Sequence, residues 1–453
     1  MGPAVLVAAR RPEGRGAPVT GLCPPTPPSS APAGAPAFRS LLHVNEKGGR
    51  FGGTEEYLAV LGAELGRRQV TSHLVCGSHG SDLPDDGLAS THLLDGLARR
   101  EGAPGTAEAL AGLVRRLGPE VVYLHNVFDA RLVEALDELR PRPVLLWYVH
   151  DHYVTCLTEL RLRREGACTS LLGQACLGAV AAGECVRRHE ERDFGLAELA
   201  AREALLGAAG RADAVVVVSR YMRDLLQAHL AASADRVHLL PRPIRLGPSA
   251  ARPGARGVGA RGGSGRGRVV AFAGRITPEK GLDVVLEALG SMVGTGPVEL
   301  RIAGVVEHEA HWERCCALAR AAQAANHDLQ VRYLGHLSYA EADDLFALAD
   351  VVVVPSRWPE PLGAVVGEAL ARGAAVAASR VGGLDTFVEH EQSGLLVEPG
   401  DVAAWAAALH RLLTDRPLAR RLAEQGAQLA ARHSIEAHVD ALDDLVRRIG
   451  RLG

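Results

Sequence analysis

Long apolar runs are absent from the sequence, and so is a marked excess of charge of one sign. No uninterrupted apolar stretch approaches the ~20 residues that a helix needs to cross a bilayer, which excludes an ordinary transmembrane helix. The formal net charge is only −3, which favours neither a nucleic-acid-binding protein nor a polyanion. Residues 1–15 carry basic side chains but no continuous apolar segment, so we expect no secretory signal and a cytoplasmic location.

Aromatic residues and cysteines are also scarce. Phe, Trp and Tyr make up 4% of the chain, and the abundance of Ala, Gly, Arg and Leu is typical of a GC-rich genome rather than of a function. We expect the eight cysteines to be thiols, because disulfides are rare inside cells. Four of them lie close together at spacings that match no common zinc motif, so a metal site or a disulfide stays open for this group: Cys156, Cys168, Cys176 and Cys185.

The 453 residues are too many for one ordinary core, so we expect two domains. Residues 1–38 are rich in Pro, Ala and Gly and are predicted to form a disordered tail. Apolar strand-like runs alternate with helical patterns over 39–245 and again over 269–432, and an Arg/Gly-rich linker at 246–268 separates these two stretches. The alternation predicts an α/β fold of two Rossmann-like, doubly wound parallel-sheet domains facing across a cleft, followed by a final helix within 433–453.

The strongest candidate site follows the predicted strand Val351–Val354. Glu360 lies on the loop after this strand, and Glu368 lies in the first turns of a helix that is expected to begin near Gly363. The helix N-terminus offers free backbone N–H groups and a positive dipole end, which suit a diphosphate. The rise from Gly363 to Glu368 is ~7–8 Å, so one carboxylate can bind a ribose while the other binds a second sugar. Taken alone, the spacing of the pair is better explained by two solvated carboxylates, and it is the surrounding strand, loop, helix and Gly-Gly context that favours a binding site.

A second strand–loop–helix segment, residues 272–281, carries Arg275 and Lys280 on either side of its loop. Two fixed cations there would stabilise the charge that a nucleoside diphosphate gains as it leaves. The chain contains no Asp-x-Asp pair, which is the common way to hold a divalent ion for the same purpose. Ordinary surface solvation with pairing to Glu279 is the alternative.

Two segments in the first half are further candidates. The predicted strand Leu41–Val44 runs into a glycine-rich turn, Lys47–Gly53, which ends in Gly52 and Gly53 and precedes a helix. The backbone of this turn can therefore approach a phosphate closely. His150 and Asp151 follow the predicted strand Val144–Val149, at the strand end where ligands of such sheets bind. A plain tight turn and a buried histidine are the alternatives.

Together these segments resemble glycosyltransferase family 4. The stretch 355–401 is similar to the donor-site signature of that family with its Glu-x7-Glu pair, while 272–289 and 51–65 resemble its phosphate loop and its amino-terminal glycine turn. The resemblance covers roughly residues 41–250 and 268–449. It implies the GT-B architecture, a nucleotide diphosphate sugar as co-substrate, transfer with retained anomeric configuration, and neither a metal nor another cofactor.

The resemblance also implies a role for each candidate residue. Glu368 would bind the ribose, and Glu360 the donor sugar. Arg275 and Lys280 would bind the diphosphate, and His150 would hydrogen-bond the sugar near the reacting carbon. Further donor contacts are implied at six positions: Gly52, Gly53, Leu362, Gly363, Gly382 and Gly383. This chain departs from the family pattern where Leu362 replaces the usual Phe and where Asp385 replaces a frequent Glu.

The expected activity is transfer of a hexose-type sugar to an acceptor hydroxyl, in glycan, glycolipid or glycoconjugate synthesis. The acceptor can be a small molecule, a glycan or a lipid-linked sugar, and a small basic patch leaves peripheral contact with the inner face of a membrane open: Arg161, Arg163 and Arg164. The last helix is expected to pack back toward the first domain, as in the family. Two alternatives remain, a nucleotide-sugar 2-epimerase on the same fold and a non-catalytic protein that binds anions or nucleic acid through the Arg/Gly-rich linker.

Overall fold

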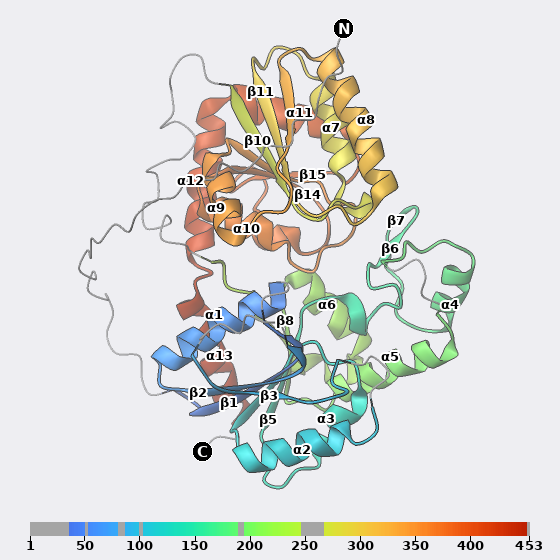
Figure 1. Ribbon diagram of the computed structural model, residues 1–453, viewed down its shortest axis with the longest axis vertical. Helices are drawn as coiled ribbons and strands as arrows, with labels where there is room; N and C mark the ends of the chain where they lie inside the picture. The colour runs from blue at the N-terminus through green and yellow to red at the C-terminus, as the bar shows by residue number, and fades with distance from the viewer. Residues whose placement is uncertain are drawn as a thin grey trace, which may run out of the picture.

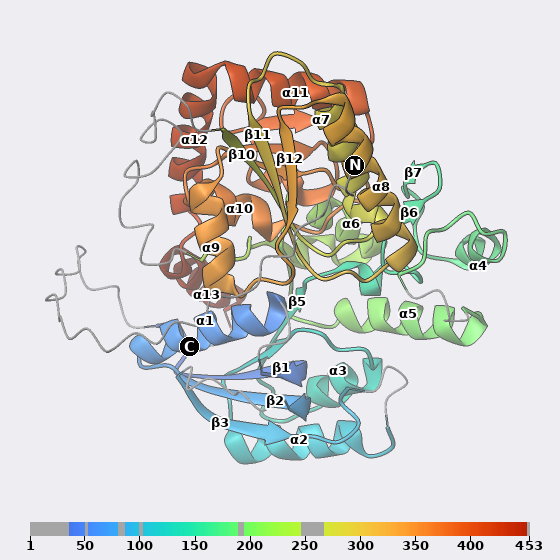
Figure 2. The ribbon, with the colours of Figure 1, turned by 45° about the horizontal axis from the view of Figure 1, so that its top comes forward.

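The computed structural model describes residues 36–49, 53–79, 87–98, 103–188, 194–245 and 267–450. Most of the predicted tail and most of the predicted linker lie outside these residues. The described chain forms two lobes, each built on a parallel sheet with helices on both faces (Figures 1 and 2). The predicted α/β fold with two doubly wound sheets is therefore confirmed.

The first lobe contains a seven-stranded sheet in the order β3-β2-β1-β4-β5-β8-β9. Every residue of β4, β5 and β8 is buried, as expected for strands that are covered on both faces. The strands are β1 (Ser40–Gly48), β2 (Thr71–His79), β3 (Leu88–Leu93), β4 (Val121–Leu124), β5 (Val144–Val149), β8 (Ala214–Val217) and β9 (Val237–Leu239).

Strand β1 is longer than the sequence pattern indicates. The apolar pattern predicts a strand that ends at Val44 and a turn that contains Lys47 and Gly48, but both of these residues pair in parallel with β2. The reason is that β2 also continues, to His79, so the pairing extends beyond the apolar run. The glycine-rich turn is therefore shorter than expected and leads directly to helix α1 (Gly53–Arg67).

The remaining helices of this lobe cover the two faces of the sheet, with α1 and α2 on opposite faces (Figure 2). They are α2 (Thr106–Leu117), α3 (Ala130–Asp137), α5 (Leu196–Ala209) and α6 (Arg220–His229). A further segment, residues 155–188, projects sideways (Figure 1) and is called the arm below. It contains the short strands β6 (Leu162–Arg163) and β7 (Gly166–Ala167) and helix α4 (Gln174–Ala181), none of which the sequence predicted.

The second lobe contains a six-stranded parallel sheet in the order β12-β11-β10-β13-β14-β15. Its strands are β10 (Arg268–Ala273), β11 (Val298–Ala303), β12 (Leu329–Tyr333), β13 (Val351–Val354), β14 (Ala375–Ser379) and β15 (Leu395–Val397). Its helices are α7 (Leu282–Ser291), α8 (Glu309–Ala325), α9 (Tyr339–Leu348), α10 (Ala364–Ala371), α11 (Val402–Thr414) and α12 (Arg416–Ala431). Because β10 and β13 are neighbours, the loops that follow these two strands leave the sheet side by side.

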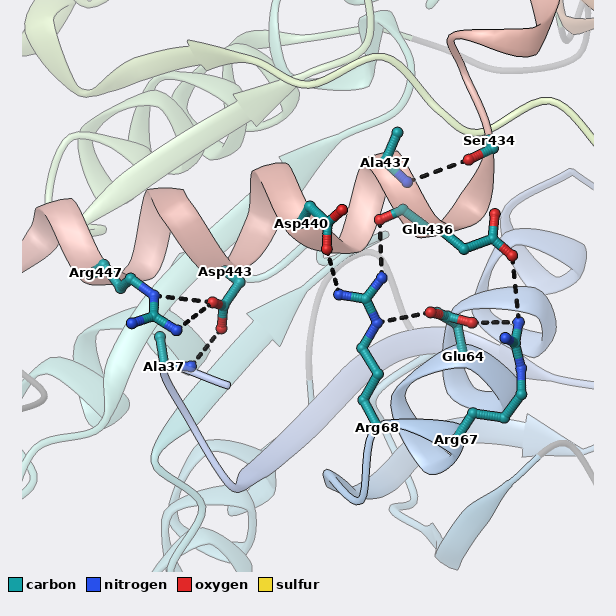
Figure 3. A network of polar contacts seen from close by, with 10 residues as sticks. All are labelled: Ala37, Glu64, Arg67, Arg68, Ser434, Glu436, Ala437, Asp440, Asp443 and Arg447. Carbon is teal, nitrogen blue, oxygen red and sulfur yellow. Dashed lines mark hydrogen bonds and ion pairs between the residues drawn. The ribbon is translucent and has the colours of Figure 1, made fainter. Parts of the chain in front are cut away.

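The last helix, α13 (Ile435–Ile449), packs on α1 of the first lobe. Figure 3 shows the polar part of this contact, in which Arg68 bonds Asp440 at 2.5 Å, the Glu436 carbonyl at 3.0 Å and the buried Glu64 carboxylate at 2.6 Å. The chain therefore crosses between the lobes twice. The two crossings touch, since the Ile244 N–H donates to the His433 carbonyl at 2.7 Å.

Candidate functional site

Glu360 occupies the loop between β13 and α10, and its side chain is buried. One carboxylate oxygen, Oε1, accepts hydrogen bonds from Lys280 Nζ at 2.6 Å and from Ser356 Oγ at 2.6 Å. Burial by itself would raise the pKa of Glu360, but the charge of Lys280 and these hydrogen bonds hold the pKa below its ordinary value. The site thus holds an ionised carboxylate against a lysine.

A residue that the sequence analysis did not single out, Arg357, joins the two loops that carry this pair. Its guanidinium binds both carboxylate oxygens of Asp283 at 2.9 Å and the Pro278 carbonyl at 3.0 Å. Its backbone N–H donates to the Glu279 carbonyl at 2.8 Å. A bidentate arginine–carboxylate pair constrains geometry as well as contributing energy, so Arg357 fixes where Glu360 and Lys280 meet.

Arg275 lies at the rim of the same place. Its guanidinium bonds Glu307 at 2.7 Å and approaches Glu279 at 3.5 Å, and its side chain is 32% exposed. The pairing with Glu279 that the sequence left as the alternative is therefore present. A bound diphosphate would compete with both carboxylates for this cation.

Glu368 lies on α10 and faces a small cavity between the lobes, which Glu56, Arg242, Arg245 and Tyr339 also line. Burial raises the pKa of Glu368, and the positive charge of Arg242 partly opposes the rise. Arg245 bonds Glu56 at 3.0 Å and lies over the Tyr339 ring. The predicted ribose-binding carboxylate therefore opens onto space shared by both lobes.

Three glycines shape the backbone around Glu360. Gly363 caps α10 in the left-handed conformation, φ 75°, and a Cβ there would lie 2.1 Å from a methyl carbon of Leu384. A Cβ on Gly382 would lie 2.4 Å from the Glu360 carbonyl oxygen, and the Gly383 N–H donates to that oxygen at 2.7 Å. These glycines hold the loop in place, as does the buried Leu362, and a direct contact of any of them with a ligand stays a prediction.

The predicted glycine turn is described only in part. Gly52 lies outside the described residues, whereas Gly53 is the first residue of α1. A Cβ on Gly53 would lie 2.6 Å from Nη1 of Arg242, a residue on the first crossing between the lobes. Within the described ranges no hydrogen-bond or ion-pair partner of Arg242 occurs. Sequence reasoning missed Arg242, because only an arginine between two prolines after a strand marks it.

The segment after β5 reaches across to the second lobe. His150 hydrogen-bonds His125 at 3.0 Å, and the His152 ring nitrogen Nε2 lies 2.7 Å from the Pro359 carbonyl, next to Glu360. Asp151 bonds Arg188 of the arm at 2.9 Å, so it orients the arm. The predicted site residues His150 and Glu360 thus lie on segments that touch each other.

The arm packs on the loop between β13 and α10 through Trp358. Leu160 and Leu162 of the arm form a buried cluster with this ring, and Arg188 and Lys280 both lie over it, at 5.6 and 5.4 Å from its centroid. The four cysteines of the arm region are free thiols. In the part of the chain that the structure describes, no three His, Cys, Asp or Glu side chains lie close enough together to bind a metal ion. In the same residues, no helix is long and apolar enough to cross a membrane.

Two family models divide the chain between them. The model described as "Glycosyltransferase Family 4" matches residues 51–247, and the model described as "Glycosyl transferases group 1" matches residues 261–429. The first match contains Gly53 and His150, and the second contains the loops of Lys280 and Glu360. The chain belongs to glycosyltransferase family 4.

A curated relative of this family 4 chain is the D-inositol 3-phosphate glycosyltransferase of Corynebacterium urealyticum. The two are 35% identical over 185 residues, which are 40% of this chain and 43% of the relative. The chain thus spans less than half the length of this curated relative.

Solved structures agree over nearly the whole chain. Sucrose-phosphate synthase from Thermosynechococcus elongatus superposes with a TM-score of 0.67 at 21% identity, covering 91% of this chain and 99% of that one. Anabaena HepE in complex with UDP and glucose superposes with a TM-score of 0.62 at 18% identity, covering 90% and 100%. At such identities the likeness shows the fold, and it confirms the GT-B architecture.

Proposed function

We propose that this family 4 enzyme transfers a hexose-type sugar from a nucleotide diphosphate sugar to an acceptor hydroxyl, with retained anomeric configuration. The observation that carries the proposal is the buried, ionised Glu360 that Lys280 holds on the loop before α10. Glu360 would accept hydrogen bonds from the hydroxyls of the donor sugar. Glu368, in the second turn of α10, would accept those of the ribose.

The leaving diphosphate would be stabilised by fixed positive charge. Lys280 and Arg275 supply two cations on the loop after β10, and the free N–H groups at the start of α10 add a positive dipole end. We therefore propose a metal-independent reaction. Excess EDTA should leave turnover unchanged, and a loss that Mg²⁺ or Mn²⁺ restores would contradict this part of the proposal.

Retention needs no covalent enzyme intermediate in this proposal. The departing phosphate oxygen would take the proton of the acceptor hydroxyl while that hydroxyl attacks from the same face. His150, at the carboxyl end of β5, would hydrogen-bond the sugar during the step. Closure of the lobes would exclude water and so protect the donor from hydrolysis.

The substrates are narrowed by the names of similar proteins. The relative named D-inositol 3-phosphate glycosyltransferase makes a phosphorylated cyclitol the first acceptor to test, alongside glycans and lipid-linked sugars. The solved HepE complex contains UDP and glucose, which makes UDP-glucose the first donor to test. We propose that the enzyme acts in the cytoplasm, where nucleotide sugars would be available, with peripheral membrane contact if the acceptor is lipid-linked.

A thermal-shift screen against UDP-, GDP- and ADP-sugars tests the donor assignment. A ligand at a hundred times its Kd should add about 2.7 kcal/mol to the free energy of unfolding, and the absence of a shift with all three classes would overturn the assignment.

Two further experiments test the alternative functions. Analysis of the sugar after incubation without any acceptor separates transfer from 2-epimerisation. Deleting residues 251–266 should leave transfer largely intact, whereas a linker-based anion-binding protein would lose its binding.

A further inference from the structure

Three histidines lie in a row across the first sheet. His43 is on β1, His125 follows β4 and His150 follows β5, three strands that are neighbours in the sheet. His43 Nδ1 lies 3.2 Å from His125 Nε2, and His125 Nδ1 lies 3.0 Å from His150 Nε2. Both nitrogens of the middle ring are therefore bonded to another imidazole.

The row is uncharged at neutral pH. His43 and His125 are fully buried, and burial lowers the pKa of His43 to about 3 and the pKa of His125 well below its ordinary value. Burial and the charge of Arg242 lower the pKa of His150 to about 3, with Asp151 opposing. Among the described residues, the other titratable groups beside the row are the neutral rings of Tyr57, Tyr123 and Tyr148. His438 also acts on His150, and burial lowers the pKa of His438 to about 4, so this ring is neutral as well. Each imidazole therefore carries one N–H.

Three linked neutral rings can be protonated in two ways. Either every Nδ1 carries the hydrogen and the row donates from His43 toward His150, or every Nε2 carries it and the row donates in the opposite direction. The two differ at His43 Nε2, which is buried and has no hydrogen-bond partner among the residues that the structure describes. A buried N–H without a partner is rarer in proteins than a buried acceptor without one, so the first direction is favoured.

At the other end of the row, His150 is the ring with access to solvent. Its Nδ1 is not enclosed, and within the described ranges no hydrogen-bond partner of that atom occurs. The favoured direction leaves the N–H of His150 on this atom. The opposite direction would leave a lone pair there and would enclose the N–H of His43 without an acceptor.

We propose that His125 is a positioning residue that holds His150 in the Nδ1–H tautomer, so that His150 offers a hydrogen-bond donor to an oxygen of the transferred sugar. His43 ends the row with its lone pair facing the core. The use of this donor rests on the proposed function, but the tautomer does not. A neutral donor fixed in advance suits a sugar oxygen, because no proton has to move when the substrate binds.

Long-range 1H–15N correlation spectra of the histidine rings of the intact protein test the tautomer directly. We expect the Nδ1–H form for His150 and His125. His125→Phe removes both bonds of the middle ring, so His150 should show a mixture of tautomers. The kcat of the His125→Phe variant should fall about tenfold, which is the effect expected for one misplaced hydrogen bond. The KM of this variant for the donor should change less.

Two variants serve as controls. His43→Phe keeps the bond between His125 and His150, so His150 should keep its tautomer. His73→Phe makes the same change on β2, where His73 bonds Ser90 outside the row, and should leave both the spectrum of His150 and kcat unchanged.

The outcomes separate this inference from the proposed function. An Nε2–H tautomer of His150 in the folded wild-type protein overturns the inference, whatever happens to the variants. Wild-type kcat in folded His125→Phe also overturns it. The expected tautomer in a protein that transfers no sugar would overturn the proposed function and leave the row as it is.

Discussion

Lys280 Nζ lies 2.6 Å from Glu360 Oε1, although the two residues are 80 positions apart in the chain. The contact follows from the sheet, because the loops after the neighbouring strands β10 and β13 leave it at the same edge. Arg357 holds these loops together, since its guanidinium bonds the Pro278 carbonyl of the first loop and also Asp283 at the start of α7. A lysine and an ionised carboxylate are thereby placed side by side, as the proposed roles in binding the leaving group and the sugar require.

The contact predicts that Glu360→Gln lowers turnover more than donor binding. Lys280 would lose its carboxylate partner and the sugar would lose an ionised acceptor, so we expect kcat to fall about 100-fold, with the nucleotide Kd changed by less than about fivefold. Steady-state kinetics and calorimetry of nucleotide binding check this. Ser356→Ala removes a neutral donor to the same oxygen and should cost less, and a larger loss in that variant would contradict the assigned role.

The Glu360 carboxylate also makes a prediction about pH. Its pKa is lowered in the folded state, so the ionised form and its contribution to folding are present above the unfolded value of about 4.3 and are lost only as pH falls through the lower folded pKa. The free energy of unfolding of the wild type should therefore drop relative to Glu360→Gln as pH falls below about 4. Denaturation curves of both proteins over this range measure the difference.

Glu368 should titrate in the opposite sense. Burial raises the pKa of Glu368, so its ionised form is lost at a higher pH than for an ordinary glutamate. In the proposed role, this ionised form would accept hydrogen bonds from the ribose hydroxyls. We expect the nucleotide Kd to rise as the buffer becomes mildly acidic. Glu368→Gln should abolish this pH dependence of the Kd and should weaken nucleotide binding about tenfold at neutral pH. Glu424→Gln, on the exposed side of α12, is the matched control. Equal affinity in wild type and Glu368→Gln would remove the ribose role.

Arg242 should contribute to binding of the diphosphate. Its guanidinium lies beside Gly53 at the start of α1 and has no hydrogen-bond or ion-pair partner within the described ranges. We expect Arg242→Gln to weaken binding of a nucleoside diphosphate about tenfold and to leave binding of the nucleoside unchanged. The side chain of Arg245 is already paired with Glu56. Arg245→Gln should therefore change the affinity for the nucleoside diphosphate as little as the affinity for the nucleoside. Similar results for the two variants would argue against a phosphate contact.

The contact between α1 and α13 predicts a difference in stability. Glu64 is buried and bonds Arg68, so Arg68→Ala leaves a buried carboxylate with one partner fewer and should cost about 2 kcal/mol of unfolding free energy. Asp440, the outer partner of Arg68, is 61% exposed, so Asp440→Asn should cost less than about 1 kcal/mol. Chemical denaturation measures both values, and equal costs would show that burial does not decide the effect.

The local sequence determined most of the helices and strands, and it also determined the part of the candidate site that surrounds Glu360. The strands Val121–Leu124, Val144–Val149 and Val351–Val354 have the predicted bounds, because strands covered on both faces are apolar at every position. The order of strand, loop and helix around Glu360 could be predicted for the same reason. Strands β3 and β9 and the arm were missed, because these short and partly exposed elements carry no such pattern.

The tertiary structure alone decided which distant residues meet. Strand order is not encoded in any local pattern, and it is the order β1-β4-β5 that lines up His43, His125 and His150. Likewise, Arg242 reaches Gly53 only because the crossing between the lobes passes the start of α1. Sequence periodicity therefore determined whether a segment forms a helix or a strand. The packing of these segments against one another decided which site residues are charged and where their protons lie.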